Sequence, residues 1–175
     1  MNNKLVWAKT ILSVYRYLER ICGAIDKLVM QSALASADII GQKFHYNNVF
    51  SISQKLIDYS ERKITLINLK ILVEECLSEI NPKQAGLLIE KYVDEKKVRQ
   101  IASDNDLSLR SAFRKLALAE TSFDAKLRFK GYNEFKLQEF LKDEKWILQT
   151  YSRIANDNVD DFSLSNTFLS KAVSM

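Results

Sequence analysis

Few residues in this chain of 175 residues could catalyse a reaction, and they are scattered. The single histidine, His45, has no cysteine or carboxylate cluster beside it, so it fits neither a zinc site nor a Ser-His-Asp arrangement. Cys22 and Cys76 stand among apolar residues in helical patterns, and we interpret them as small buried hydrophobes. Adjacent acids such as Glu74 and Glu75, with no His or Cys partner, are typical of surface charge. The sequence therefore predicts no enzyme, no metal site and no cofactor.

Cations and apolar residues alternate at helical spacings between residues 81 and 123. Three short helices joined by tight links are predicted there: residues 82–93, 95–104 and 108–122. Asn81 can cap the first helix, with Pro82 as its first residue, and Ser108 can cap the third.

This stretch resembles the helix-turn-helix of sigma factor region 4 and of the related response-regulator output domains. The likeness rests on a pattern of an apolar residue ahead of Ile-Ala, then Leu-Ser, then a small pair and a last apolar residue. The residues that form it here are Val98, Ile101, Ala102, Leu107, Ser108, Ser111, Ala112 and Leu116. Lys83-Gln84 ahead of Leu87-Leu88 and Tyr92 resembles the helix that leads into the motif. The turn differs, since Asn105 and Asp106 replace the usual Leu and Gly, although Asp tolerates the left-handed conformation that Gly provides.

The resemblance implies a bacterial-type transcription regulator whose third helix enters the major groove of double-stranded DNA. Arg110 and Arg114 would reach a guanine edge or a phosphate, and Phe113 would contact a thymine methyl or pack on the following helix. Cations of the second helix would lie over the phosphate backbone. The predicted DNA-binding residues are Leu109, Arg110, Phe113, Arg114, Lys115, Lys96, Lys97 and Arg99.

The charge balance permits an anionic partner without requiring one. The net charge is +4, and residues 82–131 hold 11 basic residues against seven acidic ones. The resemblance also makes RNA polymerase a candidate partner. The N-terminal half, however, shows no polymerase-binding and melting region, so the likeness describes the module and not a whole sigma factor.

The elements that would position this module are helices, because the chain has only four glycines and one proline to form turns. We predict an all-α helical bundle with a long N-terminal helix over about residues 3–38. Its apolar residues follow a heptad seam: Trp7, Ile11, Val14, Leu18, Ile21, Ile25 and Leu28. The seam would either form a homodimer or pack on residues 51–80 of the same chain.

Four regions are predicted along the chain: residues 1–80 for assembly or regulation, 81–131 for the module, 132–155 for a C-terminal helix and 156–175 for a flexible tail. Asn47-Asn48 favours a turn in a connection over residues 41–50. Residues 51–80 form either one bent helix or two short ones. Gly131 precedes a last helix over about residues 133–155, whose apolar side is Phe135, Phe140, Trp146, Ile147, Tyr151 and Ile154.

The competing hypothesis is an α-helical adaptor that binds proteins through the heptad face or the aromatic last helix and never contacts DNA. Exposed side chains of Arg110 and Arg114 would favour DNA binding, whereas ion pairs at these residues would favour the adaptor. No apolar run approaches the roughly 18 residues of a membrane span, and the first residues show no signal-peptide pattern. We therefore expect a cytoplasmic protein that does not bind membranes.

Overall fold

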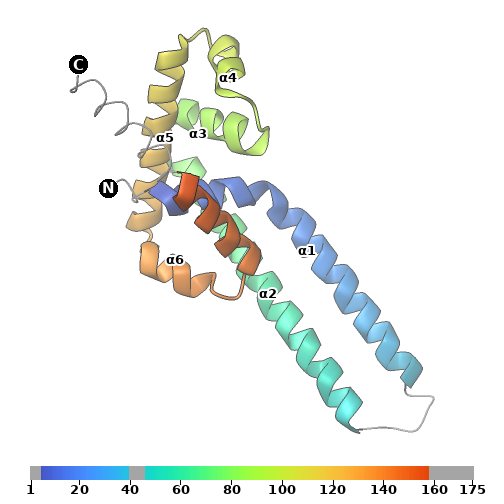
Figure 1. Cartoon of the computed structure of the whole chain (residues 1–175). Helices are drawn as coiled ribbons and strands as arrows, with labels where there is room; N and C mark the ends of the chain where they lie inside the picture. Colours follow the sequence, from blue (N-terminus) through green and yellow to red (C-terminus); the bar gives the residue numbers. More distant parts are fainter. Residues whose placement is uncertain (1–4, 40–45, 158–175) are drawn as a thin grey trace, which may run out of the picture. The chain divides into compact units, whose positions relative to one another are not determined.

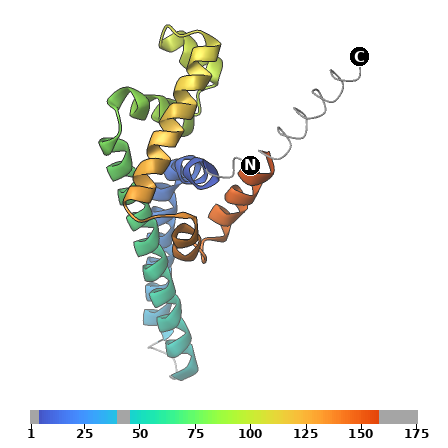
Figure 2. The same ribbon diagram turned by 90° about the vertical axis from the view of Figure 1, so that its left-hand side faces the viewer.

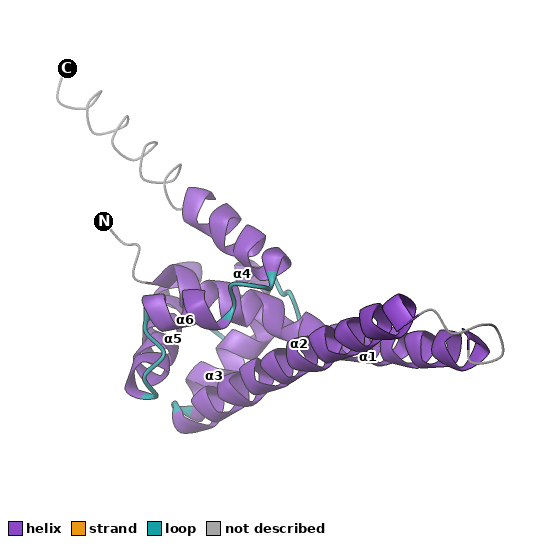
Figure 3. Ribbon diagram, turned by 90° about the horizontal axis from the view of Figure 1, so that it is seen from below, coloured by secondary structure: helices purple, strands orange, loops and turns teal. Residues whose placement is uncertain are grey.

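Helices form the described part of the chain. The computed structural model describes residues 5–39 and 46–157, and every regular element within these ranges is a helix (Figure 3). The all-α fold predicted from the scarcity of glycine and proline is therefore confirmed. The chain divides into two compact units: Arg16–Leu72, and Met1–Tyr15 together with Val73–Met175.

Two long helices, α1 (Val6–Ile39) and α2 (Tyr46–Glu79), run side by side in opposite directions (Figures 1 and 2). Two ion pairs join them within the unit Arg16–Leu72. Asp26 pairs with Lys63, and Glu19 pairs with Lys70 at 3.7 Å. The partners are seven residues apart on each helix and follow opposite directions, so α1 and α2 form an antiparallel hairpin in heptad register.

Within this hairpin, Leu18 and Ile25 of the α1 heptad seam are buried and Ile21 is partly buried. Leu18 and Ile25 are 0% and 1% exposed, and α2 contributes Leu66 and Leu69, both fully buried. Only Leu28, at the end of the seam, is 40% exposed. Of the two uses predicted for the seam, packing within one chain is the one that the structure contains.

Helix α2 is one continuous helix and not two short ones. It begins at Tyr46, so the predicted turn at Asn47-Asn48 is wrong. Asn side chains suit the first turn of a helix as well as a loop, because the first N–H groups lack partners in the helix itself. The polar residues further along do not interrupt it: Lys63 pairs across the hairpin, and the Thr65 hydroxyl donates to the Glu61 carbonyl at 3.2 Å.

The unit that includes Val73–Met175 contains the three helices around the predicted motif. They are α3 (Pro82–Leu88), α4 (Val98–Asp104) and the longer α5 (Leu109–Phe129) (Figure 1). Leu87, Ile101 and Leu116, one from each helix, form a buried cluster, and Val98 packs against it. The Asn81 side chain accepts a hydrogen bond from the Lys83 N–H at 2.9 Å, which confirms the predicted cap ahead of Pro82.

The helix bounds differ from the prediction in two places. The first helix continues as a π-helix, η2 (Ile89–Val93), and Glu95 then ends it with a left-handed backbone, φ 54°. As a result α4 starts at Val98, not at residue 95. At the other end, α5 continues past residue 122 to Phe129, because Phe123 and Leu127 extend its fully buried side.

The predicted helix over residues 133–155 is wrong as a single element. After Gly131, which has φ 83°, the chain forms α6 (Glu134–Phe140) and then a separate helix over residues 145–157. Leu141, at the start of the break, and Ile147, after it, are both fully buried. Phe135, predicted on the apolar side, is 78% exposed instead.

Several predictions concern other parts of the chain. Cys76 is buried, as predicted, and burial raises the pKa of its thiol to about 11, whereas Cys22 is only partly buried. His45 and the tail from residue 158 lie outside the described residues. None of the described helices is both long and apolar enough to cross a membrane.

Candidate nucleic-acid interface

The turn between α4 and α5 is a tight, fully hydrogen-bonded helix end. Asp106 has φ 52°, so it adopts the left-handed conformation expected to be tolerated there. The Leu107 N–H donates to the Ala102 carbonyl at 2.8 Å, and the Asp106 N–H donates to the Ser103 carbonyl at 3.3 Å. This pair of bonds is a Schellman motif with Asp106 in the position usually held by Gly. It fixes where α5 begins relative to α4.

Helix α5 begins with its own cap. The Ser108 hydroxyl oxygen accepts a hydrogen bond from the Ser111 N–H at 3.2 Å, which confirms the predicted role of Ser108. Ala112 and Leu116 are buried on the side of α5 that faces α3 and α4. The side chains between them therefore point outward over the first two turns.

Those outward side chains combine charge with apolar surface. Leu109 is 42% and Phe113 55% exposed, and Arg110, Arg114 and Lys115 are exposed as well. Within the part of the chain that the structure describes, neither Arg110 nor Arg114 forms an ion pair. Two arginines one turn apart and an exposed aromatic ring thus share the first two turns of α5.

The cations predicted on the second helix are not equivalent. Lys97 and Arg99 are exposed, Lys97 immediately ahead of α4 and Arg99 in its first turn. Lys96 precedes the helix, and its ammonium group lies 2.9 Å from Asp104 and 3.4 Å from Glu90. The hydrogen bond to Asp104 raises the pKa of Lys96. Lys96 therefore links η2 to α4 through ion pairs, whereas the sequence predicts that it contacts a DNA phosphate.

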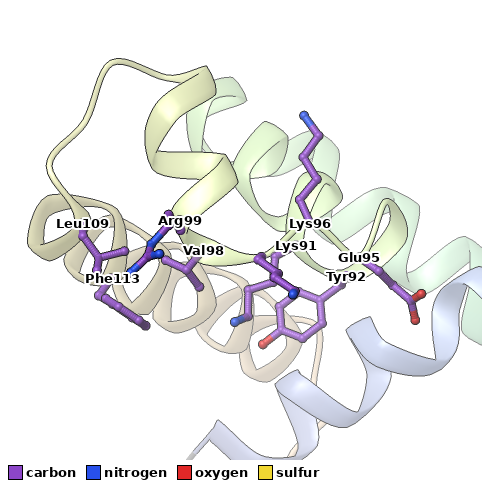
Figure 4. A pocket seen from close by; sticks show the side chains of 9 residues that line it. Lys91, Tyr92, Glu95, Lys96, Val98, Arg99, Leu109 and Phe113 are labelled. Atoms are coloured by element: carbon purple, nitrogen blue, oxygen red, sulfur yellow. The ribbon is translucent and has the colours of Figure 1, made fainter.

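An open groove of about 510 Å³ lies between these elements (Figure 4). Its apolar part comes from Val98, Leu109 and Phe113, and its cations include Lys91, Lys97 and Arg99. In Figure 4 the Arg99 side chain extends toward Leu109 and Phe113, whereas the carboxylate of Glu95 points away from them. An anionic ligand in this groove would therefore lie among several cations and beside apolar side chains.

Four residues of this groove were not predicted as part of the interface, and Lys91 and Tyr92 are two of them. Both lie in η2, where the π-helical turn changes the angle between successive side chains. No hydrophobic pattern in the sequence distinguishes a single π-helical turn from an α-helix. Their position could not have been found from spacing.

A buried polar contact holds η2 against α5 behind the groove. The Tyr92 hydroxyl donates to Glu120 Oε1 at 2.6 Å, and Lys9 Nζ lies 3.7 Å from Glu120 Oε2. Glu120 is only 6% exposed. Burial, together with the negative charge of Glu120, raises the pKa of Tyr92, so its hydroxyl remains a donor in the folded protein.

The exposed cations and apolar side chains of this surface are suited to binding anions and apolar groups. Among the described residues, no group of three or more His, Cys, Asp or Glu side chains is placed to hold a metal ion. Comparison with protein-family models, with curated proteins and with solved structures gives no match to this chain. A functional proposal for this chain therefore rests on the geometry of the site.

Proposed function

We propose that this chain binds double-stranded DNA and regulates transcription, with the first turns of α5 inserted into the major groove. One observation carries the proposal: Leu109, Arg110, Phe113 and Arg114 are all exposed at the start of α5, the helix that follows the tight turn after α4. Neither arginine has an acidic partner among the described residues. The N-terminal residues of such a helix are those that reach base edges.

The exposed side chains then have distinct roles. Arg110 and Arg114 donate to guanine edges or phosphates, and Phe113 contacts thymine methyl groups. Leu109 lies beside Phe113 in the groove and adds apolar contact. Three further cations, Lys97, Arg99 and Lys115, neutralise phosphates and so position the helix without reading sequence.

The likeness to sigma factor region 4 adds RNA polymerase as a second proposed partner. A bacterial-type regulator that binds both DNA and polymerase acts in the cytoplasm, and we place the protein there. The hairpin of α1 and α2 would then serve assembly or regulation of the DNA-binding module.

The test is a binding assay on random DNA duplexes at two salt concentrations. It compares the wild type with the double variant Arg110→Ala/Arg114→Ala. Loss of two base or phosphate contacts should weaken binding roughly 10- to 100-fold and make log Kd less dependent on log salt, by about one to two units of slope. A matched control, Lys145→Ala/Arg153→Ala, removes two exposed cations from the helix over residues 145–157 and should bind like the wild type.

Two results would contradict the proposal. One is wild-type protein that binds no duplex at low salt. The other is equal weakening by the control variant, which would mean that net charge alone, and not the start of α5, determines binding.

A second candidate function is the protein-binding adaptor. The observation in its favour is exposed aromatic surface around the end of α5 and the start of α6, where Phe129 and Phe135 are 84% and 78% exposed. Aromatic residues are enriched in protein interfaces. Absence of DNA binding at low salt would make this adaptor the better conclusion.

A further inference from the structure

A second pocket, of about 500 Å³, lies between α3, α5 and the turn that precedes α5. It shares no lining residue with the groove beside Phe113, and its residues all belong to the unit that includes Val73–Met175. Its α5 residues, Lys115 and Leu118, lie on a different side of that helix from Phe113. Pockets of this size in proteins hold small molecules. We call it the α3–α5 pocket.

A glycine stands in the α3 wall of this pocket although neither the backbone nor the packing requires one. Gly86 lies inside α3 and does not have a positive φ. A Cβ atom added there would meet no atom within 4 Å, so a side chain has room. Alanine is more stable than glycine inside a helix. The effect of Gly86 is therefore to leave the wall open, so that a ligand can approach the backbone closely.

Two lysines give the α3–α5 pocket its charge. Lys83 lies on α3 and Lys115 on α5, and both are exposed. Neither ammonium group forms an ion pair with any residue that the structure describes. The acid in the lining, Glu90, already lies 3.4 Å from the Lys96 ammonium group and accepts from the Asn105 amide at 3.0 Å. Two positive charges of the pocket are thus left for an anionic ligand.

The rest of the lining combines apolar surface with an amide group. Leu87 belongs to the buried cluster of the module and also lines the pocket, and Leu118, on α5, is 57% exposed. The Gln84 side chain forms no hydrogen bond with any described residue, so its carbonyl oxygen and its NH₂ group are both available. Such an amide presents a donor and an acceptor side by side, as the edge of a nucleobase does. A ring with a polar edge is therefore suited to this part of the pocket.

We propose that the α3–α5 pocket binds a small phosphate monoester that carries a ring, of the nucleoside monophosphate class. The phosphate group binds Lys83 and Lys115, because its charge of about −1.5 to −2 at neutral pH balances two ammonium groups. Lysine brings a point charge on a flexible stem, so both side chains can approach one phosphate from their separate helices. The ring covers Leu118 and the open wall at Gly86, and its polar edge bonds to the Gln84 amide.

This site does not rest on the proposed DNA binding. Lys115 is the one residue that both would use, and the other proposed DNA contacts lie outside the lining of the α3–α5 pocket. A bound phosphate monoester and a DNA phosphate would compete for that single cation. Ligand binding is measured on the protein without DNA, so either proposal can fail while the other stands.

Titration of the isotope-labelled full chain with adenosine monophosphate, followed by heteronuclear NMR, tests the site. Saturable shifts should appear at the Gly86 backbone N–H and the Gln84 side-chain NH₂, with Kd below about 1 mM. Adenosine, which lacks the phosphate, and inorganic phosphate, which lacks the ring, should each bind roughly 10-fold more weakly or worse. Absence of saturable shifts at these two groups, or shifts centred on Phe113 instead, would overturn the proposal. Adenosine that binds as tightly as the monophosphate would overturn the role of the lysines.

Two variants test the residues of the pocket separately. Lys83→Gln/Lys115→Gln removes both charges from exposed positions and should weaken binding of adenosine monophosphate roughly 10-fold or more. Gly86→Leu fills the open wall without changing the charge and should weaken binding to a similar extent. Far-UV circular dichroism shows whether each variant keeps its helices, and the lysine variant tests the proposal even if Gly86→Leu fails to fold.

The matched control for the lysine variant is Lys55→Gln/Lys145→Gln. It removes two exposed lysines that do not line the pocket, and it should bind adenosine monophosphate like the wild type. Equal weakening by this control would mean that net charge alone determines binding, which would overturn the proposal. A folded Gly86→Leu variant that binds as tightly as the wild type would overturn it as well.

Discussion

Replacing Tyr92 by Phe tests the contact that holds η2 against α5. The substitution keeps the ring and removes the hydroxyl that donates to Glu120 Oε1 at 2.6 Å. Among the described residues, Glu120, 6% exposed, then retains only Lys9, 3.7 Å from its other oxygen. A hydrogen bond to a charged group contributes about 1.5–3 kcal/mol, and a buried carboxylate oxygen without a donor adds to the loss. We expect the free energy of unfolding to fall by about 2 kcal/mol.

Urea denaturation followed by far-UV circular dichroism measures this change, and thermal unfolding should show a Tm lower by about 4–8 °C. Tyr132→Phe is the matched control, because the Tyr132 hydroxyl makes no hydrogen bond among the described residues. A double-mutant cycle with Glu120→Leu should give a coupling energy of about 1–2 kcal/mol, since the two side chains act on each other. If Tyr92→Phe lies within about 0.5 kcal/mol of the wild type, the hydrogen bond does not stabilise the module and our reasoning is wrong.

Two further predictions concern the backbone turn and the buried thiol. Asp106→Gly should be more stable to urea than Asp106→Ala by about 1 kcal/mol, because only Gly adopts φ near 52° without strain; equal stabilities would contradict this. Burial raises the pKa of Cys76 from 9.0 to about 11, so the unfolded thiol ionises at lower pH than the folded one. The stability contributed by this difference is complete below pH 9 and is lost as pH rises through about 11. Denaturation at pH 8 to 11 should therefore show a smaller decline in Cys76→Ala than in the wild type, and parallel declines would count against it.

The sequence predicts the helical class and the caps well, because these depend on local chemistry. The scarcity of glycine and proline favours helix locally. Asn81 and Ser108 cap their helices through hydrogen bonds to backbone groups two and three residues later. The break before residue 145 coincides instead with the burial of Leu141 and Ile147, which depends on contacts made elsewhere in the fold. Asn47-Asn48 suits a loop and a first helical turn equally, so propensity alone could not decide between them.

The candidate interface was predictable only in part, for the same reason. The exposed start of α5 follows from the spacing of Ala112 and Leu116, which face inward. The ion pairs of Lys96 were not predicted, because its partners, Glu90 and Asp104, become neighbours only after η2 and α4 fold against each other.

The π-helix makes the module sensitive to chain length as well as to residue type. A π-helical turn holds one residue more than the α-helical turn that it replaces. Deletion of a single residue between Ile89 and Tyr92 would let η2 close into an α-helix, and Tyr92 would rotate by about 100° away from Glu120. Two related chains could thus share every residue of α4 and α5 and still differ in their grooves because of one insertion. Evolution could change this groove by a single codon gained or lost, a route that substitution alone does not provide.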